Sequence, residues 1–191
     1  LAIAQVQAIL RQQFPALTEK EISLLPDKLG NPLKYRFRSL LFVGEDQKGQ
    51  VKGFAFVQHE PDLNFFYLDF ISTARKLTGR GIGGALYERV RQEALALQTL
   101  GIFMECLPDD PKLSADPVIL KQNKARLKFY EQYGARPIIN TKYETPVNPG
   151  DDNPPYLVFD DLGRNTPLPA AVARKIVRTI LERKYAGFCP T

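Results

Sequence analysis

The chain has 191 residues, of which 44% are hydrophobic and 25% are charged, and its formal net charge is +5. A chain of this length buries its own core without staples, and no apolar run approaches the roughly 18 residues that a membrane span requires. One histidine, two cysteines without zinc-type spacing and no Gly-x-Ser-x-Gly motif argue against a metal site, a disulfide framework and a Ser-His-Asp hydrolase. We therefore expect a protein of a reducing, cytoplasmic compartment that binds neither a metal nor a membrane.

The predicted elements alternate in an order that indicates the fold class. Helices are predicted from apolar spacing and capping signals, and they cover about 2–14, 18–29, 81–99, 120–133 and 169–185. Strands are predicted at 38–45, 51–58, 65–71, 101–107, 136–143 and 156–159. His59 is expected in an exposed turn. A hairpin followed by strand–helix–strand units predicts a mixed, mostly antiparallel α/β sheet with helices on both faces.

The basic character of the chain is concentrated in its last predicted helix. From Pro169 onward five basic residues accompany one acidic residue, so this segment carries +4 and the remainder is nearly neutral. We expect a domain over 1–168 and a basic C-terminal helix or tail over 169–191. The chain begins at Leu1 without an initiator methionine, which is typical either of a trimmed sequence or of one domain of a longer protein, and in the second case the tail leads to a further domain. This helix either docks with its charges in water or contacts an acidic partner. Few aromatic residues interleave its charges, so nucleic acid is not the expected partner.

The most informative stretch is Gly79 to Gly84, which holds four glycines in six residues. Glycine lets a ligand approach the backbone closely, and N–H groups that open a helix bind anions. The apolar strand at 65–71 precedes this stretch, and the amphipathic helix at 81–99 follows it. Strand, glycine turn and helix form the layout of a pyrophosphate site, which three classes of cofactor site share.

A dinucleotide site and a nucleotide-hydrolysing phosphate loop are the first two alternatives. Gly79, Gly81 and Gly84 satisfy Gly-x-Gly-x-x-Gly, and Glu105 lies near the end of the next strand, where a ribose-binding acid belongs. However, residues 72–78 separate the strand from the glycine turn, whereas a dinucleotide turn is short. An antiparallel hairpin also precedes that strand, whereas a Rossmann unit would begin with the strand itself. No Gly-Lys-Ser/Thr sequence ends the turn, which disfavours the phosphate loop.

The third alternative is acetyl-CoA, and here the chain resembles the GNAT superfamily of N-acetyltransferases over roughly residues 35–145. Residues 78–83 match the family motif Arg/Gln-x-x-Gly-x-Gly/Ala, with Thr78 in place of the usual Arg or Gln. Residues 123–134 match its second signature, Asn-x-x-Ala-x-x-Phe-Tyr-x-x-x-Gly. The two motifs occur in the family's order, separated by one strand, and together they favour acetyl-CoA over the dinucleotide.

The resemblance implies a fold, a reaction and a set of site residues. The fold is a GNAT-like sheet that is splayed between the strand ending near Thr73 and the strand beginning near Gly101. The reaction moves an acetyl group from acetyl-CoA to a primary amine by direct attack, and Tyr130 protonates the CoA thiolate. The implied cofactor contacts are Ile71, Ser72, Thr73, Thr78, Gly79, Arg80, Gly81, Ile82, Gly83, Gly84 and Asn123.

Several roles have more than one candidate at this point. Glu105, Asp69 and a chain of waters are alternative general bases, and this chain lacks the carboxylate that some family members carry at the position of Tyr67. Asn123 equally fits an N-terminal helix cap. The missing carboxylate, Thr78 in place of Arg or Gln and the trimmed-looking ends of the chain favour a non-catalytic acyl-CoA-binding module as the alternative function. The oligomeric state is open.

The acceptor amine is a small molecule or a protein lysine. Its expected walls are the two N-terminal helices and the loops at 108–117 and 145–155. These loops concentrate negative charge at Asp109, Asp110, Asp116, Asp151 and Asp152. The charge favours a cationic amine, unless these residues only form turns.

Overall fold

The computed structural model describes residues 2–74, 81–114, 116–139, 141, 143 and 155–185. The chain divides into two compact units, Leu1–Leu100 and Gly101–Thr191. The first unit has four N-terminal helices, three strands and a long helix. The helices are α1 (Ala2–Gln13), α2 (Glu19–Ser23), α3 (Leu25–Gly30), α4 (Pro32–Tyr35) and α5 (Ile82–Ala96). The strands are β1 (Arg38–Glu45), β2 (Val51–Glu60) and β3 (Phe65–Thr73).

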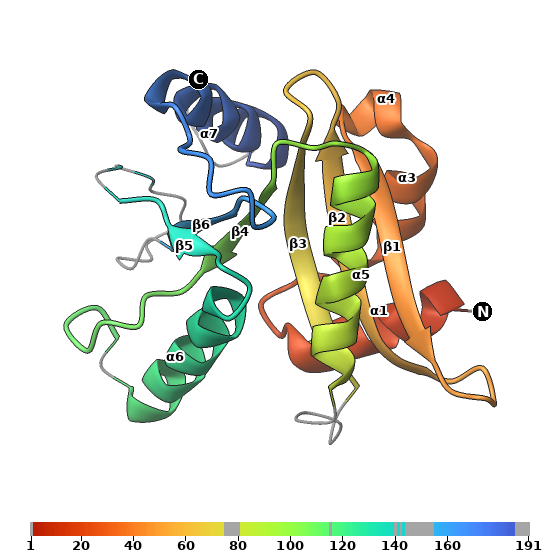
Figure 1. Ribbon diagram of the computed structural model, residues 1–191. Coiled ribbons are helices and arrows are strands. Elements are labelled where there is room, and N and C mark those ends of the chain that lie inside the picture. Colours follow the sequence, from red (N-terminus) through yellow and green to blue (C-terminus); the bar gives the residue numbers. More distant parts are fainter. Residues whose placement is uncertain are drawn as a thin grey trace. The chain divides into compact units, whose positions relative to one another are not determined.

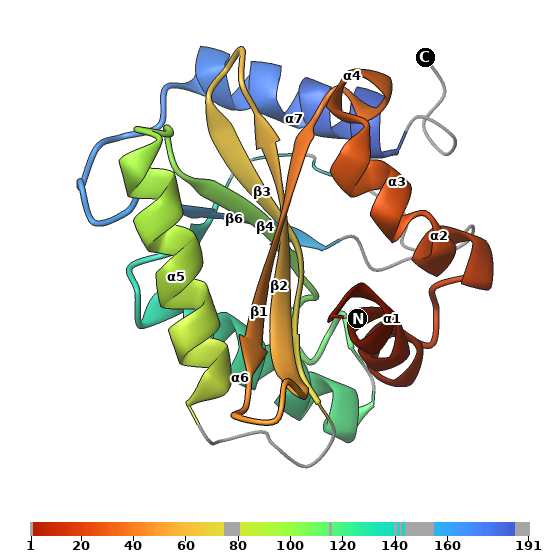
Figure 2. The ribbon, with the colours of Figure 1, turned by 90° about the vertical axis from the view of Figure 1, so that its right-hand side faces the viewer.

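The three strands of the first unit form an antiparallel sheet with β2 in the centre. Helix α5 lies along one face, and α1 to α4 lie along the other (Figures 1 and 2). Helix α5 packs closely on β2 at Gly53. A Cβ at this position would lie 3.0 Å from the side chains of Ile82 and Leu86, which is tighter than most contacts of a Cβ atom. On the opposite face, Phe54 and Phe56 of β2 join a core cluster with residues of α1 to α3.

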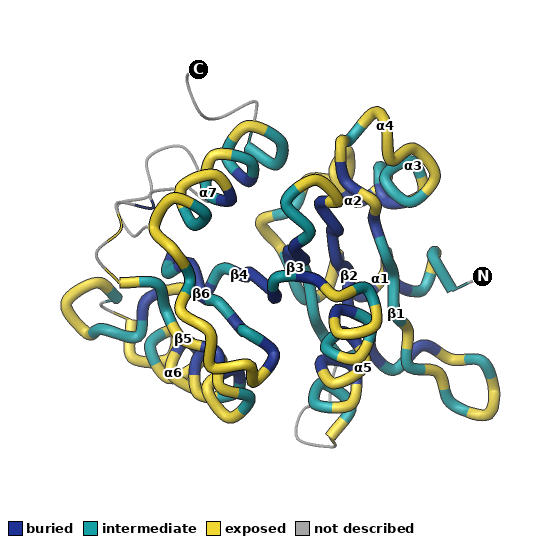
Figure 3. The backbone as a smooth tube through the Cα atoms, turned by 45° about the horizontal axis from the view of Figure 1, so that its top comes forward, coloured by how far each residue is buried: buried dark blue, intermediate teal, exposed yellow. Residues whose placement is uncertain are grey.

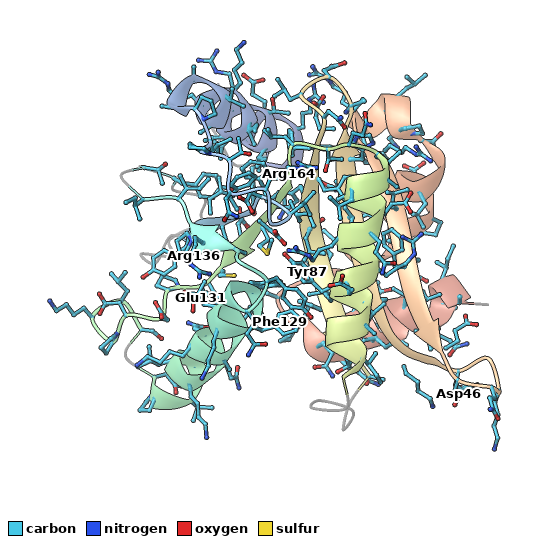
Figure 4. The ribbon with its side chains drawn as sticks, viewed as in Figure 1. Asp46, Tyr87, Phe129, Glu131, Arg136 and Arg164 are labelled. Carbon is cyan, nitrogen blue, oxygen red and sulfur yellow. The ribbon has the colours of Figure 1, made fainter. Side chains whose placement is uncertain are left out.

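The second unit contains β4 (Ile102–Cys106), α6 (Pro117–Glu131), β5 (Arg136–Pro137), β6 (Tyr156–Asp160) and α7 (Ala170–Lys184). Strand β6 pairs antiparallel with both β4 and β5. At the C-terminal end of α6, the Arg136 guanidinium donates a hydrogen bond of 3.0 Å to the carbonyl oxygen of Glu131 (Figure 4). Such a contact satisfies one of the carbonyls that a helix end leaves without an intrahelical partner.

The expected fold class, a mixed and mostly antiparallel α/β fold with an extra C-terminal helix, is confirmed. The described strand pairings within each unit are antiparallel, and helices cover both faces of β1 to β3. Helix α7 buries Ile176 and Ile180, as its apolar spacing predicts. The expected splay beside Thr73 concerns the placement of the two units and stays a prediction, as does the boundary at residue 168.

Three sequence-based expectations of local structure differ from the structure. The single helix expected over 18–29 keeps its capping box at Thr18, but it ends at Ser23 and α3 begins at Leu25, because Pro26 has no N–H to donate to the preceding turn. The strand expected over 136–143 is described as a strand only at Arg136–Pro137. The exposed turn expected at His59 is wrong.

His59 belongs to β2 and has an exposed fraction of 8%. Strand β2 extends to Glu60 because His59 and Glu60 pair with Phe66 and Phe65 of β3. The His59 Nε2 atom lies 3.0 Å from the Asn64 Oδ1 atom, which ties the strand end to the following turn.

We predict that Gly101→Ala lowers the free energy of unfolding by about 1–3 kcal/mol, the usual cost of overpacking. A Cβ at this position would lie 2.5 Å from the Asp160 carbonyl oxygen and 2.4 Å from the Phe159 ring, and the backbone oxygen cannot rotate away. Urea denaturation measures the loss. Gly30→Ala is the control, because no described atom lies within 4 Å of its added methyl group. Equal effects of the two changes would contradict the steric argument.

Candidate active site

Helix α5 begins at a glycine turn that suits an anion. Gly81 is its N-cap and has a φ of 78°, a left-handed conformation that favours glycine. Among the described residues no side chain caps this helix end, and its first turn holds no acidic residue. A helix start of this kind attracts negative charge through its dipole and its N–H groups. These features fit the pyrophosphate of coenzyme A.

The expected cofactor residues lie partly in this turn and partly on β3. Ile82 and Gly83 follow Gly81 in the first turn of α5, and no described atom lies within 4 Å of a Cβ placed on Gly83. Gly84 is the next helical residue. Thr78, Gly79 and Arg80 lie outside the described residues. The structure therefore describes one part of the motif and leaves the rest as a prediction.

Strand β3 ends in three half-buried residues, Ile71, Ser72 and Thr73. One edge of this segment is bonded to β2, where its partners are Ala55, Phe54 and Gly53. The resemblance implies that the pantetheine arm of the cofactor pairs with this backbone. That contact stays a prediction.

Asp69 is the extra residue of a β-bulge in β3. Phe70 pairs with Phe56 and Leu68 pairs with Val57, so Asp69 has no opposite residue on β2. Bulges re-aim side chains, and they are frequent next to active sites. Asp69 is half-buried. It is close enough to α2 to act on Glu21: hydrogen bonds from Thr18 lower the pKa of Glu21, and the negative charge of Asp69 opposes that shift. The carboxylate therefore lies on the α1–α4 side of the sheet.

Tyr130 lies near the end of α6 and has an exposed fraction of 4%. Burial raises the pKa of its phenol well above the ordinary value, the nearby Cys106 raises it further, and Arg126 opposes the shift. The phenol therefore keeps its proton at neutral pH. Burial likewise raises the pKa of the Cys106 thiol to about 12, so Cys106 remains a neutral thiol. The neighbourhood of Tyr130 thus offers a proton donor without a competing anion at Cys106.

Asn123 is not the N-cap of its helix, so that alternative is wrong. Asp116 holds the cap and accepts a 2.7 Å hydrogen bond from the Val118 N–H. The buried Asn123 amide instead donates to the carbonyl oxygen of Pro108 at 2.8 Å. This bond ties α6 to the loop that follows β4. Its expected contact with the cofactor stays a prediction.

Glu105 is held by a network that the sequence did not indicate. Its two carboxylate oxygens accept hydrogen bonds from the Tyr143 and Tyr185 hydroxyls at 2.5 and 2.6 Å. Lys184 Nζ lies 3.7 Å from Glu105 Oε2. Burial raises the pKa of Tyr185, which keeps this hydroxyl a donor. Tyr143 and Tyr185 are 38 and 80 residues away along the chain, so no local pattern could have paired them with Glu105.

Metals and membranes are not indicated by the described part of the chain. Within it, no three His, Cys, Asp or Glu side chains gather where they could hold a metal ion. None of the helices in the same ranges is long and apolar enough to span a membrane.

The Acetyltransferase (GNAT) family matches residues 3–135 of the sequence. This match covers more than half of the chain, and the chain therefore belongs to the GNAT acetyltransferase family. The sequence matches none of the curated proteins.

Solved structures of the same fold include enzymes with bound coenzyme A. An aminoglycoside 6'-N-acetyltransferase complexed with coenzyme A is 14% identical, with a TM-score of 0.63 over 87% of this chain and 92% of that chain. A putative GNAT-family acetyltransferase from Bacteroides thetaiotaomicron is 19% identical, with a TM-score of 0.61 over 94% and 89%. The NatC complex bound to Gag peptide and CoA is 14% identical, with a TM-score of 0.61 over 84% and 90%. At these identities the likeness shows the fold.

We predict that Gly83→Leu weakens coenzyme A binding at least tenfold, about 1.4 kcal/mol, without lowering the melting temperature of the free protein. The space around Gly83 admits a side chain, whereas a bound pyrophosphate would compete for that space. Isothermal titration calorimetry measures the affinity. Gly83→Ala is the matched control, because the family motif accepts alanine here, and it should bind nearly as the parent does. Unchanged affinity of the leucine variant would place the pyrophosphate elsewhere.

Proposed function

We propose that the chain is an N-acyltransferase that moves an acetyl group from acetyl-CoA to a primary amine by direct attack. The observation that carries this proposal is the family match over residues 3–135, which makes the chain a GNAT acetyltransferase. The start of α5 supports it, because Gly81 and Gly83 suit a pyrophosphate and no described side chain caps this helix end. The cosubstrate supplies an activated acyl group when bound.

In this reaction the neutral amine attacks the thioester carbon, so that a C–N bond forms and the C–S bond breaks. A base removes the proton that the amine loses. Tyr130 donates its phenolic proton to the departing sulfur and regains a proton from solvent afterwards. The burial of Tyr130 supports this role, since a phenol with a raised pKa enters the reaction protonated.

We propose Asp69 as the base, acting directly or through water. Its position in a bulge supports the role, because the bulge turns an acidic side chain out of the regular alternation of β3. Glu105 is the weaker candidate, since its oxygens already accept hydrogen bonds from Tyr143 and Tyr185. A carboxylate held in this way would have to break a bond before accepting a proton.

We propose a cationic amine as the acceptor, either a small molecule or a lysine side chain. Asp110 and Asp116 are explained as turn and cap residues, because they accept hydrogen bonds from the N–H groups of Lys112 and Val118. Asp109 differs from them: burial raises the pKa of Tyr156, and the nearby charge of Asp109 raises it further, on a strand that pairs with β4. Two solved neighbours are aminoglycoside 6'-N-acetyltransferases, which supports an acceptor of this charge. Asp151 and Asp152 lie outside the described residues.

We predict that Tyr130→Phe lowers kcat by about 100-fold or more while the Kd for coenzyme A stays unchanged, since general acid catalysis contributes on that order. Release of free CoA with a panel of amines measures turnover, and calorimetry measures binding. Tyr133→Phe makes the same chemical change three residues further on and should leave kcat unaffected.

The same assay separates the enzyme from a non-catalytic acyl-CoA-binding module. Tyr67, buried at the position where some family members carry a carboxylate, is the observation that favours such a module. A parent protein that binds coenzyme A but acetylates none of the amines would support the module and reject the enzyme.

We predict that Asp109→Asn raises KM for cationic amines about fivefold, a loss on the order of 1 kcal/mol for one charge interaction. KM for neutral amines should not change. Asp110→Asn is the matched neighbour, and it should affect KM little because Asp110 is occupied by its turn. The electrostatic proposal fails if the best acceptors are neutral or acidic, or if both variants behave like the parent.

A further inference from the structure

One row of buried polar side chains crosses the three strands of the first unit. Ser39 of β1 lies opposite Gln58 of β2, and Gln58 lies opposite Tyr67 of β3. Their exposed fractions are 8%, 5% and 1%. Residues directly opposite each other in a sheet share a face, so the three side chains belong to the same face.

This row continues the face that the N-terminal helices cover. Gln58 follows Phe56 at a spacing of two residues, and Ser39 precedes Leu41 at the same spacing. Phe56 and Leu41 belong to the core cluster that packs with α1 to α3. The bulged Asp69 follows this row on β3 by two residues. A ligand held at the row would therefore lie beside the proposed base.

Two atoms of this row have unmet hydrogen-bonding capacity. Ser39 Oγ and Gln58 Oε1 are buried, and neither has a hydrogen-bond partner among the described residues. Folding normally pairs such atoms, because a buried polar atom without a partner loses its interactions with water and gains nothing in return. His59 Nδ1 is also buried without a partner among the described residues, but Ser39 and Gln58 lie directly opposite each other on one face, so a single ligand group between them would satisfy both.

The chemistry of the two atoms indicates what that partner carries. A carboxamide oxygen only accepts hydrogen bonds, whereas a serine hydroxyl both donates and accepts. A ligand hydroxyl can donate to Gln58 Oε1 and accept from the Ser39 hydroxyl, so that both are satisfied at once. An ammonium group can only donate, and it would leave the Ser39 proton without an acceptor.

We propose that Ser39 and Gln58 form the acceptor-recognition site and that they bind a hydroxyl group carried by the acceptor amine. This inference rests on the proposed N-acyltransferase function and names its substrate class: small hydroxylated amines, such as amino sugars. The hydroxyl anchors the acceptor on the sheet, and the amine then lies toward Asp69. A site built for a hydrogen bond rejects an analogue that lacks the group, because its own polar atoms stay unpaired.

The test compares glucosamine with cyclohexylamine, a ring amine without hydroxyls, as acceptors for the parent and for Gln58→Leu. We expect the parent to favour glucosamine in kcat/KM, and we expect the variant to reduce this preference at least tenfold through a loss of kcat/KM for glucosamine. Ser39→Ala should act in the same direction. A parent without the preference, or a variant that keeps it, overturns the proposal.

Urea denaturation gives a second measurement that does not depend on activity. Replacing an unsatisfied amide by leucine should leave the urea midpoint unchanged or raise it. Gln7→Leu is the matched control, because the Gln7 amide donates to the Ile22 carbonyl oxygen at 3.0 Å, so its loss should lower the midpoint. If Gln58→Leu lowers the midpoint as Gln7→Leu does, the amide serves the fold through bound water and the proposal is overturned.

The failure of this proposal can be told from the failure of the proposed function. A parent that releases free CoA equally with both amines is an acetyltransferase without the hydroxyl site. If it releases CoA with neither amine, the proposed function fails for these acceptors. The binding of glucosamine, measured without turnover, then tests the hydroxyl site. Glucosamine should then raise the melting temperature of the CoA-bound parent but not of Gln58→Leu, and no shift in the parent overturns the site.

Discussion

The first unit depends on the pairing of β2 along both of its edges. Nine of its ten residues are buried, and the polar ones among them, Gln58, His59 and Glu60, lie at its C-terminal end. Figure 3 colours the backbone by burial. The buried residues of such a strand are shielded from bulk water, so each of their polar groups needs a partner from the protein, a bound water or a ligand. His59 and Glu60 find partners in the following turn, at Asn64 and at the Leu63 N–H. Gln58 Oε1 finds none in the described chain, and the second ring nitrogen of His59, Nδ1, likewise has none there.

In the second unit a half-buried carboxylate serves a different purpose. Glu105 lies on β4, and its two tyrosine donors come from Tyr143 and from Tyr185 at the end of α7. These two hydrogen bonds and the nearby Lys184 compensate the negative charge of Glu105, a residue that the sequence offered as a general base. Removing one partner would leave a half-buried charge less compensated, which costs more than losing a fully exposed ion pair. Glu105 therefore anchors the C-terminal helix to β4.

Local patterns in the sequence predicted the elements well and the contacts poorly. The capping box at Thr18 and the apolar spacing of α7 are signals within one turn or one helix, and both are confirmed. His59 was misplaced because Pro61 and Asp62 mark a turn but do not show where the strand before it ends.

The polar contacts lie beyond such patterns because they depend on register and on distant segments. The pairing of Ser39 with Gln58 follows from the alignment of β1 on β2, which a bulge or a slip of one residue would change. The Asn123 amide meets the Pro108 carbonyl across the loop between β4 and α6, and nothing at position 123 indicates that partner. The helix cap was instead held by Asp116, whose position before Pro117 is itself a signal for a helix start.

The burial of Tyr130 has a consequence for when it can act in the proposed reaction. A raised pKa makes a phenol a weak acid, so Tyr130 keeps its proton while the thioester sulfur is neutral. A hydrogen bond from the phenol strengthens as negative charge builds on the sulfur, and the shielded surroundings amplify that gain. The interaction is then stronger in the transition state than in the ground state, which is the condition for a group to accelerate a reaction. Burial thus makes the proton transfer depend on the breaking of the C–S bond. Around an exposed tyrosine, water would weaken the interaction with the charged sulfur, and the difference between transition state and ground state would be smaller.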